Sequence, residues 1–233
     1  MRGKNAGTAP LPVLLMLALT FSTGIIDAVG YLGLDRVFTG NMTGNVVILG
    51  MALAGGDGLP VLGPTIALGG FMVGAALGGR YLRTVPTEWG RRHSVAFGVV
   101  GILLVLIAGV LLTTGSPRTD AGHDSQTLAL GITGLMAASM GLQAAGARRL
   151  GLKDLTTVVV TSVITGLSAD SRLGGGHGQQ WERRTATVVL IAAGAATGAL
   201  LLRWHLGFGV LLAGVIALIV AVLGDTYLRT QSS

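Results

Sequence analysis

The chain has no cysteine and very few charged residues. None of its 233 residues is Cys, and only 11% carry a charged side chain. The lack of cysteine excludes disulfides, thiolate metal sites and a Cys nucleophile. A soluble domain carries about a quarter charged residues, so this chain has too little polar surface to cover a water-facing core. The scarcity of charge therefore excludes the ordinary soluble class.

Groups that do catalysis are also scarce in the apolar segments. The four histidines are His93, His123, His177 and His205, and they lie scattered in loops or at segment ends. The chain contains no HExxH, GxSxG or Walker motif. An intramembrane protease would place two Asp, or a Ser and a His, inside spanning segments. We therefore expect no enzymatic activity, no bound metal and no cofactor.

The formal net charge of +6 comes from arginine clusters between apolar segments. These clusters contain Arg80, Arg83, Arg91 and Arg92, then Arg148 and Arg149, then Arg183 and Arg184. Lys and Arg are enriched in loops that stay cytoplasmic, and no aromatic residues alternate with these arginines as they would in a nucleic-acid surface. The sequence predicts a lipid bilayer as the partner, and no nucleic acid.

Hydrophobic residues make up 51% of the chain and fall into long blocks. Because lipid leaves only helices or closed barrels and no period-2 pattern is present, each block is expected to be a helix. The expected segments are 13–34, 37–53, 61–82, 94–114, 127–147, 155–167, 185–202 and 206–223. The fold class is all-α: one integral membrane domain over residues 1–233, a polytopic bundle of about six spanning helices. Segments 37–53 and 155–167 are short and polar, and are expected to be re-entrant or broken.

The arginine clusters favour this six-span topology. If all eight segments crossed the bilayer from a cytoplasmic N-terminus, the loop with Arg80 to Arg92 would lie outside. If the two short segments return to the side from which they enter, that loop lies inside, as the positive-inside tendency favours. The expectation is a six-span membrane protein with both termini in the cytoplasm.

The two halves of the chain, 12–115 and 126–225, show a faint repeat. Gly70-x-x-x-Gly74-Ala75 in the first half matches Gly194-x-x-x-Gly198-Ala199 in the second. A short Thr-bearing segment precedes each. Three crossings per half would invert the second half relative to the first, as in many transporters. The alternative is chance, because small residues spaced by four are common in packed membrane helices.

Asp27 is the one acidic residue well inside an apolar segment, about 10 Å from the segment's end. An ionisable group at this depth costs several kcal/mol unless it is paired or hydrated. Tyr31 lies on the same helix face, one turn later. Two interpretations stay open. The carboxylate binds a solute, a cation or a proton, or it is structural and satisfied by hydroxyls or a buried Arg.

The segment FTGNMTGNVV, residues 38–47, repeats a Thr-Gly-Asn triplet. If the segment is helical, each residue of the first copy stacks on its partner in the second: Thr39 on Thr43, Gly40 on Gly44 and Asn41 on Asn45. If it is broken, its free backbone groups join these side chains in lining a hydrated site. The alternative is a polar clasp between helices that transports nothing. We favour a site-lining role.

Other candidates lie in the second half or on glycine rows. Gln143 is the nearest counterpart of Asp27, and Thr157 and Thr161 are the threonines of the short segment before Gly194. The glycine rows are expected to pack helices, within the chain or between subunits of a homo-oligomer. They comprise Gly70, Gly74, Gly78, Gly194 and Gly198, and Gly40 and Gly44 of the Thr-Gly-Asn repeat are expected to allow close helix packing as well.

The stretch GIIDAVGYLGLDRVFTGNMTGNVVILG, residues 24–50, resembles the signature of the YoaK family of bacterial multispanning proteins, a domain of unknown function. The shared features are Gly-x-x-Asp-Ala, the aromatic residue after it, and Thr-Gly-Asn close behind a Phe. MGLQAAGARRL and TTVVVTSVITG resemble the family's later Gly-x-Gln and Thr-rich segments, while the first triplet copy is fuller than the family pattern. The resemblance implies an integral protein of the bacterial inner membrane and supplies no substrate.

The functional hypothesis therefore rests on the residues themselves. It is a transporter or channel for a small solute or ion, with Asp27 and the Thr-Gly-Asn repeat at its polar site. The alternative is a non-transporting membrane scaffold or accessory subunit.

Overall fold

The structure is a computed structural model that describes residues 11–114, 123–151, 160–171, 175 and 181–231. Every regular element in these residues is a helix, so the all-α prediction is confirmed. The helices are α1 (Leu11–Gly33), α2 (Met42–Leu53), α3 (Leu62–Leu82), α4 (Arg91–Thr114), α5 (His123–Leu150), α6 (Val160–Ala169), α7 (Trp181–Leu202) and α8 (Leu206–Gln231).

Six of these helices are long and apolar enough to cross a membrane, and α2 and α6 are too short. The predicted bundle of six spans and two short segments is confirmed. The helix ends differ most at α8, which continues past the predicted end to Gln231. Its last turns are polar, and Asp225 and Arg229 pair one turn apart at 2.8 Å, a contact that supports an exposed helix end. Residues 155–159 of the predicted segment 155–167 lie outside the described residues.

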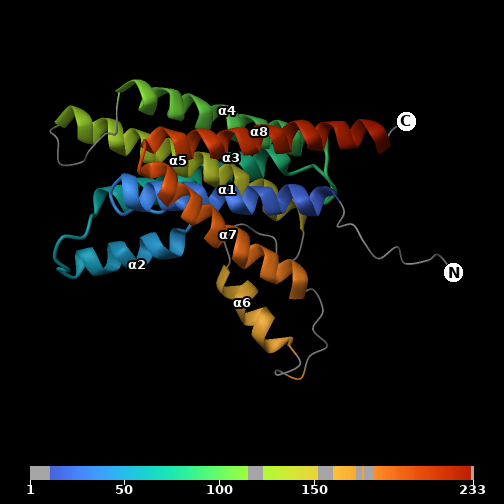
Figure 1. Cartoon of the computed structure of the whole chain (residues 1–233), viewed down its shortest axis with the longest axis horizontal. Coiled ribbons are helices and arrows are strands. Elements are labelled where there is room, and N and C mark those ends of the chain that lie inside the picture. The colour runs from blue at the N-terminus through green and yellow to red at the C-terminus, as the bar shows by residue number, and fades with distance from the viewer. Residues whose placement is uncertain (1–10, 115–122, 152–159, 172–174, 176–180, 232–233) are drawn as a thin grey trace.

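The core of the bundle lies between α1, α4, α5 and α8. In Figure 1, α4 and α8 lie side by side along one edge, with α1, α3 and α5 beneath them. Helix α3 packs on α5, and α7 packs on α1. The largest fully buried side chains include Met16, Leu19, Phe97, Leu104, Met136 and Met140.

Glycines set the spacing of two helix pairs, α3 with α5 and α7 with α1. In α3, a Cβ on Gly74 would overlap the carbonyl oxygen of Ala138 in α5. In α7, a Cβ on Gly194 would overlap the carbonyl oxygen of Phe21 in α1. Small residues allow this close backbone approach, which gives van der Waals contact where lipid supplies no hydrophobic drive. Helices of the same chain thus pack against both glycine rows.

The same contact scheme occurs in both helix pairs. Gly24 of α1 meets Ile191 of α7, and Gly141 of α5 meets Phe71 of α3 in the same way. Gly74 meets Ala138, which lies three positions before Gly141, and Gly194 meets Phe21, which lies three positions before Gly24. By their contacts, Gly74 therefore corresponds to Gly194. The sequence motifs align Gly70 with Gly194 instead, so the two alignments differ by one helical turn. Helices α1 and α5 run in opposite directions (Figure 1).

Residues 34–53 enter the bundle and return to the same end. The non-helical arm, residues 34–41, runs back along α1, and a Cβ on Gly30 would lie 2.6 Å from the carbonyl oxygen of Val37. Arg36, with a left-handed φ of 48°, makes the turn into the arm, and its Nη1 donates to the carbonyl of Gly58 at 3.4 Å. Helix α2 then leads outward to the end of the bundle where α3 begins (Figure 1). This segment is re-entrant.

We expect Gly74→Ala and Gly194→Ala to lower the free energy of unfolding by about 1–3 kcal/mol each, because the added methyl overlaps a neighbouring backbone. Gly69→Ala in α3 is the matched control, since no atom lies within 4 Å of its Cβ position. It should be neutral or slightly stabilising. Thermal melting in detergent measures the difference, and equal melting of the Gly69 and Gly74 variants would contradict the packing described.

Single cysteines test the re-entrant path, because the chain has none of its own. Arg36→Cys and Asp57→Cys should react with an impermeant maleimide from the same side of the membrane. Glu88→Cys, in the loop between α3 and α4 at the opposite end of the bundle, should react from the other side. Labelling of positions 36 and 57 from opposite sides would show that α2 crosses.

Candidate functional site

The carboxylate of Asp27 in α1 holds the arm by its backbone. Oδ1 accepts hydrogen bonds from the N–H groups of Thr39 at 3.0 Å and Gly40 at 2.7 Å. The N–H of Asn41 is directed at the same carboxylate. These residues are not helical, so their N–H groups would otherwise lack partners inside the bundle. Successive N–H groups form an anion-binding nest, and here the anion is a side chain of the same chain.

The start of α2 adds to this nest. Asn41 is the N-cap of α2, and its Oδ1 accepts from the N–H of Gly44 at 3.3 Å. The N-terminus of a helix carries a partial positive charge, so the helix start favours a carboxylate beside it. The first triplet is therefore broken backbone and an N-cap. The helical stacking of Thr39 on Thr43 does not occur.

Asn45 in the second triplet fastens the arm from the other side. Its Oδ1 accepts from the N–H of Phe38 at 2.9 Å, and its Nδ2 donates to the carbonyl of the same residue. The side chain is fully buried. One amide thus satisfies both backbone groups of Phe38. Gly44 lies under the ring of Phe38, where a Cβ would come within 2.6 Å of it.

A second polar group lies behind the arm, around Thr23 of α1. Gln143 of α5 donates from Nε2 to the Thr23 hydroxyl at 3.0 Å, and that hydroxyl donates to the carbonyl of Leu19 at 2.9 Å. The methyl of Thr23 also limits the space at Gly40, whose Cβ would lie 3.2 Å away. Thr39 Oγ1 and Gln143 Oε1 are buried here without a hydrogen-bond partner among the described residues.

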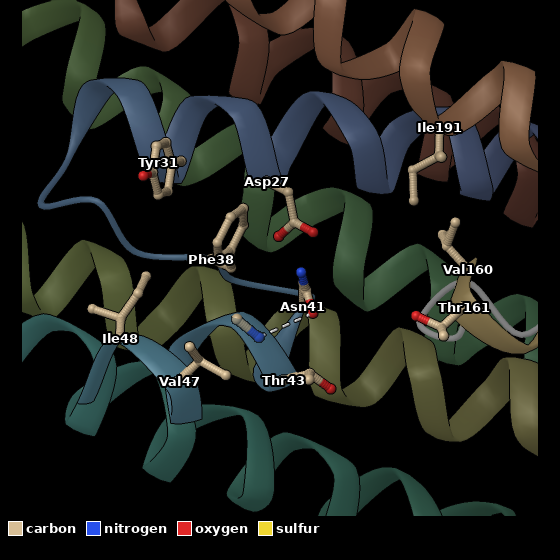
Figure 2. A pocket seen from close by; sticks show the side chains of 11 residues that line it. Asp27, Tyr31, Phe38, Asn41, Thr43, Val47, Ile48, Val160, Thr161 and Ile191 are labelled. Atoms are coloured by element: carbon tan, nitrogen blue, oxygen red, sulfur yellow. Dashed lines mark hydrogen bonds between the residues drawn. The ribbon is translucent and has the colours of Figure 1, made fainter. Parts of the chain in front are cut away.

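A cavity of about 690 Å³ opens in front of the Asp27 carboxylate. Figure 2 shows Asp27 and the Asn41 side chain pointing toward one another, with residues of α6 and α7 on the far side. The lining comes from α1, the arm, α2, α6 and α7. It comprises Asp27, Tyr31, Phe38, Asn41, Thr43, Gly44, Val47, Ile48, Val160, Thr161 and Ile191.

The lining has one carboxylate, several neutral polar groups and apolar walls. No Lys or Arg is among the described residues that line it. Tyr31 stacks on Phe38 with ring centroids 4.9 Å apart, so the aromatic pair closes one side. Ligand pockets are typically about 300–1,000 Å³, mainly apolar with a few placed polar groups. The chemistry suits a small polar or cationic solute. No cluster of three His, Asp or Glu that could hold a metal occurs in the described part of the chain.

The predicted site residues divide into two groups. Those that line the cavity are Asp27, Tyr31, Asn41, Thr43 and Thr161. Those that lie behind it and hold the arm or the helices are Thr39, Asn45 and Gln143. Thr157 lies outside the described residues.

Sequence reasoning missed Thr23 and the apolar wall formed by Phe38, Val160 and Ile191. Thr23 lies one turn before Asp27 on the same helix face, a spacing that could have identified it. Nothing in the sequence distinguishes the wall residues from other apolar residues.

We expect Asn45→Ala to lower the free energy of unfolding by about 2–4 kcal/mol, because it leaves both backbone groups of Phe38 buried and unpaired. Asn41→Ala, which removes an exposed N-cap, should cost only about 1 kcal/mol. Melting of the two variants in the same detergent measures the difference. An Asn45 variant as stable as the Asn41 variant would show that the clasp does not hold the arm.

Comparison with known proteins identifies the family of the chain. The family model described as a protein of unknown function, DUF1275, matches residues 15–224. The chain is 29% identical over 157 residues to the UPF0700 transmembrane protein YoaK of Bacillus subtilis, a match that covers 67% of this chain and 65% of that protein. No solved structure matches. The resemblance to the YoaK family is confirmed, and the chain is a multi-pass membrane protein that belongs to the DUF1275 family.

Proposed function

We propose that the chain transports a small polar or cationic solute through the cavity at Asp27. The observation that carries the proposal is a carboxylate that lines a cavity at the inner end of a re-entrant segment. Broken segments that end inside the bundle are where transporters bind solutes and ions. Buried ionisable groups in membrane helices are functional candidates by default.

The two short helices support this proposal because they meet at the same cavity. Thr43 of α2 and Thr161 of α6 both line it, although they come from different halves of the chain. The recurring glycine contacts of α1 with α7 and α5 with α3 are those expected of an inverted repeat. In such folds the solute binds where the repeats meet.

The distribution of arginine supports a cytoplasmic location for both termini. Helix α1 begins and α8 ends at the same end of the bundle (Figure 1). The described arginines lie at that end, except for Arg36 and Arg203. Since Lys and Arg are enriched on the cytoplasmic side, we place this end in the cytoplasm of a bacterial cell and the Asp27 cavity nearer the outer face.

A second candidate function is a scaffold that transports nothing. It is favoured by the bonds of the arm, because Asp27 Oδ1 and the Asn45 amide are engaged by backbone groups of the chain itself. On this reading the carboxylate only holds the arm in place. The two functions differ in whether the charge of Asp27 is needed once its hydrogen bonds are kept.

Asp27→Asn separates them, because the amide oxygen can still accept from Thr39 and Gly40 while the charge is lost. In proteoliposomes we expect wild-type flux of protons, radiolabelled rubidium or methylammonium, and at least about a tenfold loss in the variant, since one charge contact is worth more than about 1.4 kcal/mol in such a site. A pH-sensitive dye and tracer uptake measure the flux.

Asp225→Asn is the control, since it removes one carboxylate from α8 far from the cavity and should keep wild-type flux. Melting of both variants must match the wild type. If folded wild-type protein carries none of these probes, or if the Asp27 variant carries them at the wild-type rate, the transport proposal for this site fails and the scaffold function stands.

A further inference from the structure

A second cavity, of about 830 Å³, lies between α3 and α5 at the arginine-rich end of the bundle. Its inner wall is apolar and consists of Phe71, Ala75, Gly79, Leu82, Ala144 and Ala145. Its rim carries Arg83, Thr87, Arg148 and Arg149, and no acidic residue is among the described residues that line it.

Part of the lining of this cavity corresponds to part of the lining of the Asp27 cavity. Gly141 of α5 corresponds to Gly24 of α1 by their contacts with Phe71 and Ile191. Counting along the helices from these glycines, Ala144, and not Gln143 as the sequence suggested, corresponds to Asp27, and Arg148 corresponds to Tyr31. Phe71 and Ile191 each line their own cavity. Each of the two corresponding helix pairs thus borders a cavity, one with a carboxylate and one with arginines.

The arginines of the second cavity differ in what binds them. Arg149 donates from Nε to the carbonyl of Val85 at 2.7 Å and from Nη2 to the carbonyl of Arg83 at 3.0 Å. These bonds hold its charge at the rim and join the end of α5 to the loop after α3. The guanidinium groups of Arg83 and Arg148 have no hydrogen-bond or ion-pair partner within the described residues, and both residues are exposed.

We propose that this cavity binds a phosphate group. Guanidinium groups match phosphate oxygens with paired N–H donors. Arg83 and Arg148, whose guanidinium groups have no partner among the described residues, offer several such donors, with the fixed Arg149 beside them. Thr87 adds a hydroxyl. No carboxylate among the described lining residues competes for these donors.

The phosphate-bearing ligand best suited to this shape is an anionic phospholipid. The apolar wall on α3 and α5 can contact the glycerol and acyl chain, while the rim arginines meet the headgroup. Basic pockets between membrane helices on the cytoplasmic side bind such headgroups, and this end of the bundle is the one with the arginines. A soluble phosphate shares the chemistry of the headgroup but makes no use of the apolar wall.

The test uses the full chain in detergent, with phosphatidylglycerol, phosphatidylcholine and inorganic phosphate as probes. The variant Arg83→Gln/Arg148→Gln removes the two charges of the cavity that have no partner in the described part of the chain. The control Arg80→Gln/Arg91→Gln removes two exposed charges from the same end that do not line it. Native mass spectrometry counts bound lipid, and the melting midpoint is followed as lipid is titrated.

We expect phosphatidylglycerol, and not phosphatidylcholine, to bind and raise the melting midpoint. The cavity variant should need about tenfold or more lipid for half the effect, as two arginine contacts with an anionic headgroup imply, and the control should stay near the wild type. Inorganic phosphate that reproduces the effect and displaces the lipid would support the site with a soluble ligand. Equal binding of the two lipids, or equal losses in the two double variants, would overturn the proposal.

Discussion

The contact between the Asp27 carboxylate and the backbone of residues 39–41 is the interaction on which the other features of the first half depend. Non-helical backbone inside a membrane bundle needs partners for its N–H groups, and a carboxylate at this depth needs compensation for its charge. The N–H groups of Thr39 and Gly40 donate to the Asp27 carboxylate, so the carboxylate gives the arm its hydrogen-bond acceptors and the arm compensates the charge. Without this contact the arm could not turn back at that depth, and α2 could not begin beside the carboxylate.

Asn45 and Gly44 complete the constraint from the second triplet. The Asn45 amide holds both backbone groups of Phe38, and the missing side chain of Gly44 leaves room for the Phe38 ring. The two Thr-Gly-Asn copies therefore have different roles, although their sequences are nearly the same. The first copy donates backbone N–H groups to Asp27 of α1, and the second, through the Asn45 side chain, holds Phe38 just before the first copy. The cavity is the space that this arrangement leaves between α2, α6 and α7.

Glycine contacts extend the same logic to the whole bundle. Gly74 against α5 and Gly194 against α1 bring two helix pairs into backbone contact by one scheme. Because the scheme depends on backbone atoms, it tolerates different side chains around it. Asp27 and Ala144 stand at corresponding positions, and the cavities beside them carry opposite charge. The two helix pairs thus share their backbone contacts and differ in the charge of the cavity beside them.

The amino-acid sequence alone determined the membrane class, the number of spanning helices and the unusual depth of Asp27, because these follow from composition, block length and the cost of burying charge. It also indicated that the Thr-Gly-Asn segment is special. Only the tertiary structure decided that the segment is broken, because its N–H groups find the Asp27 carboxylate instead of helical carbonyls. It alone brought Thr161 to the same cavity as Thr43 and placed Gln143 on Thr23. Such pairings join residues far apart in the chain, and no local pattern encodes them.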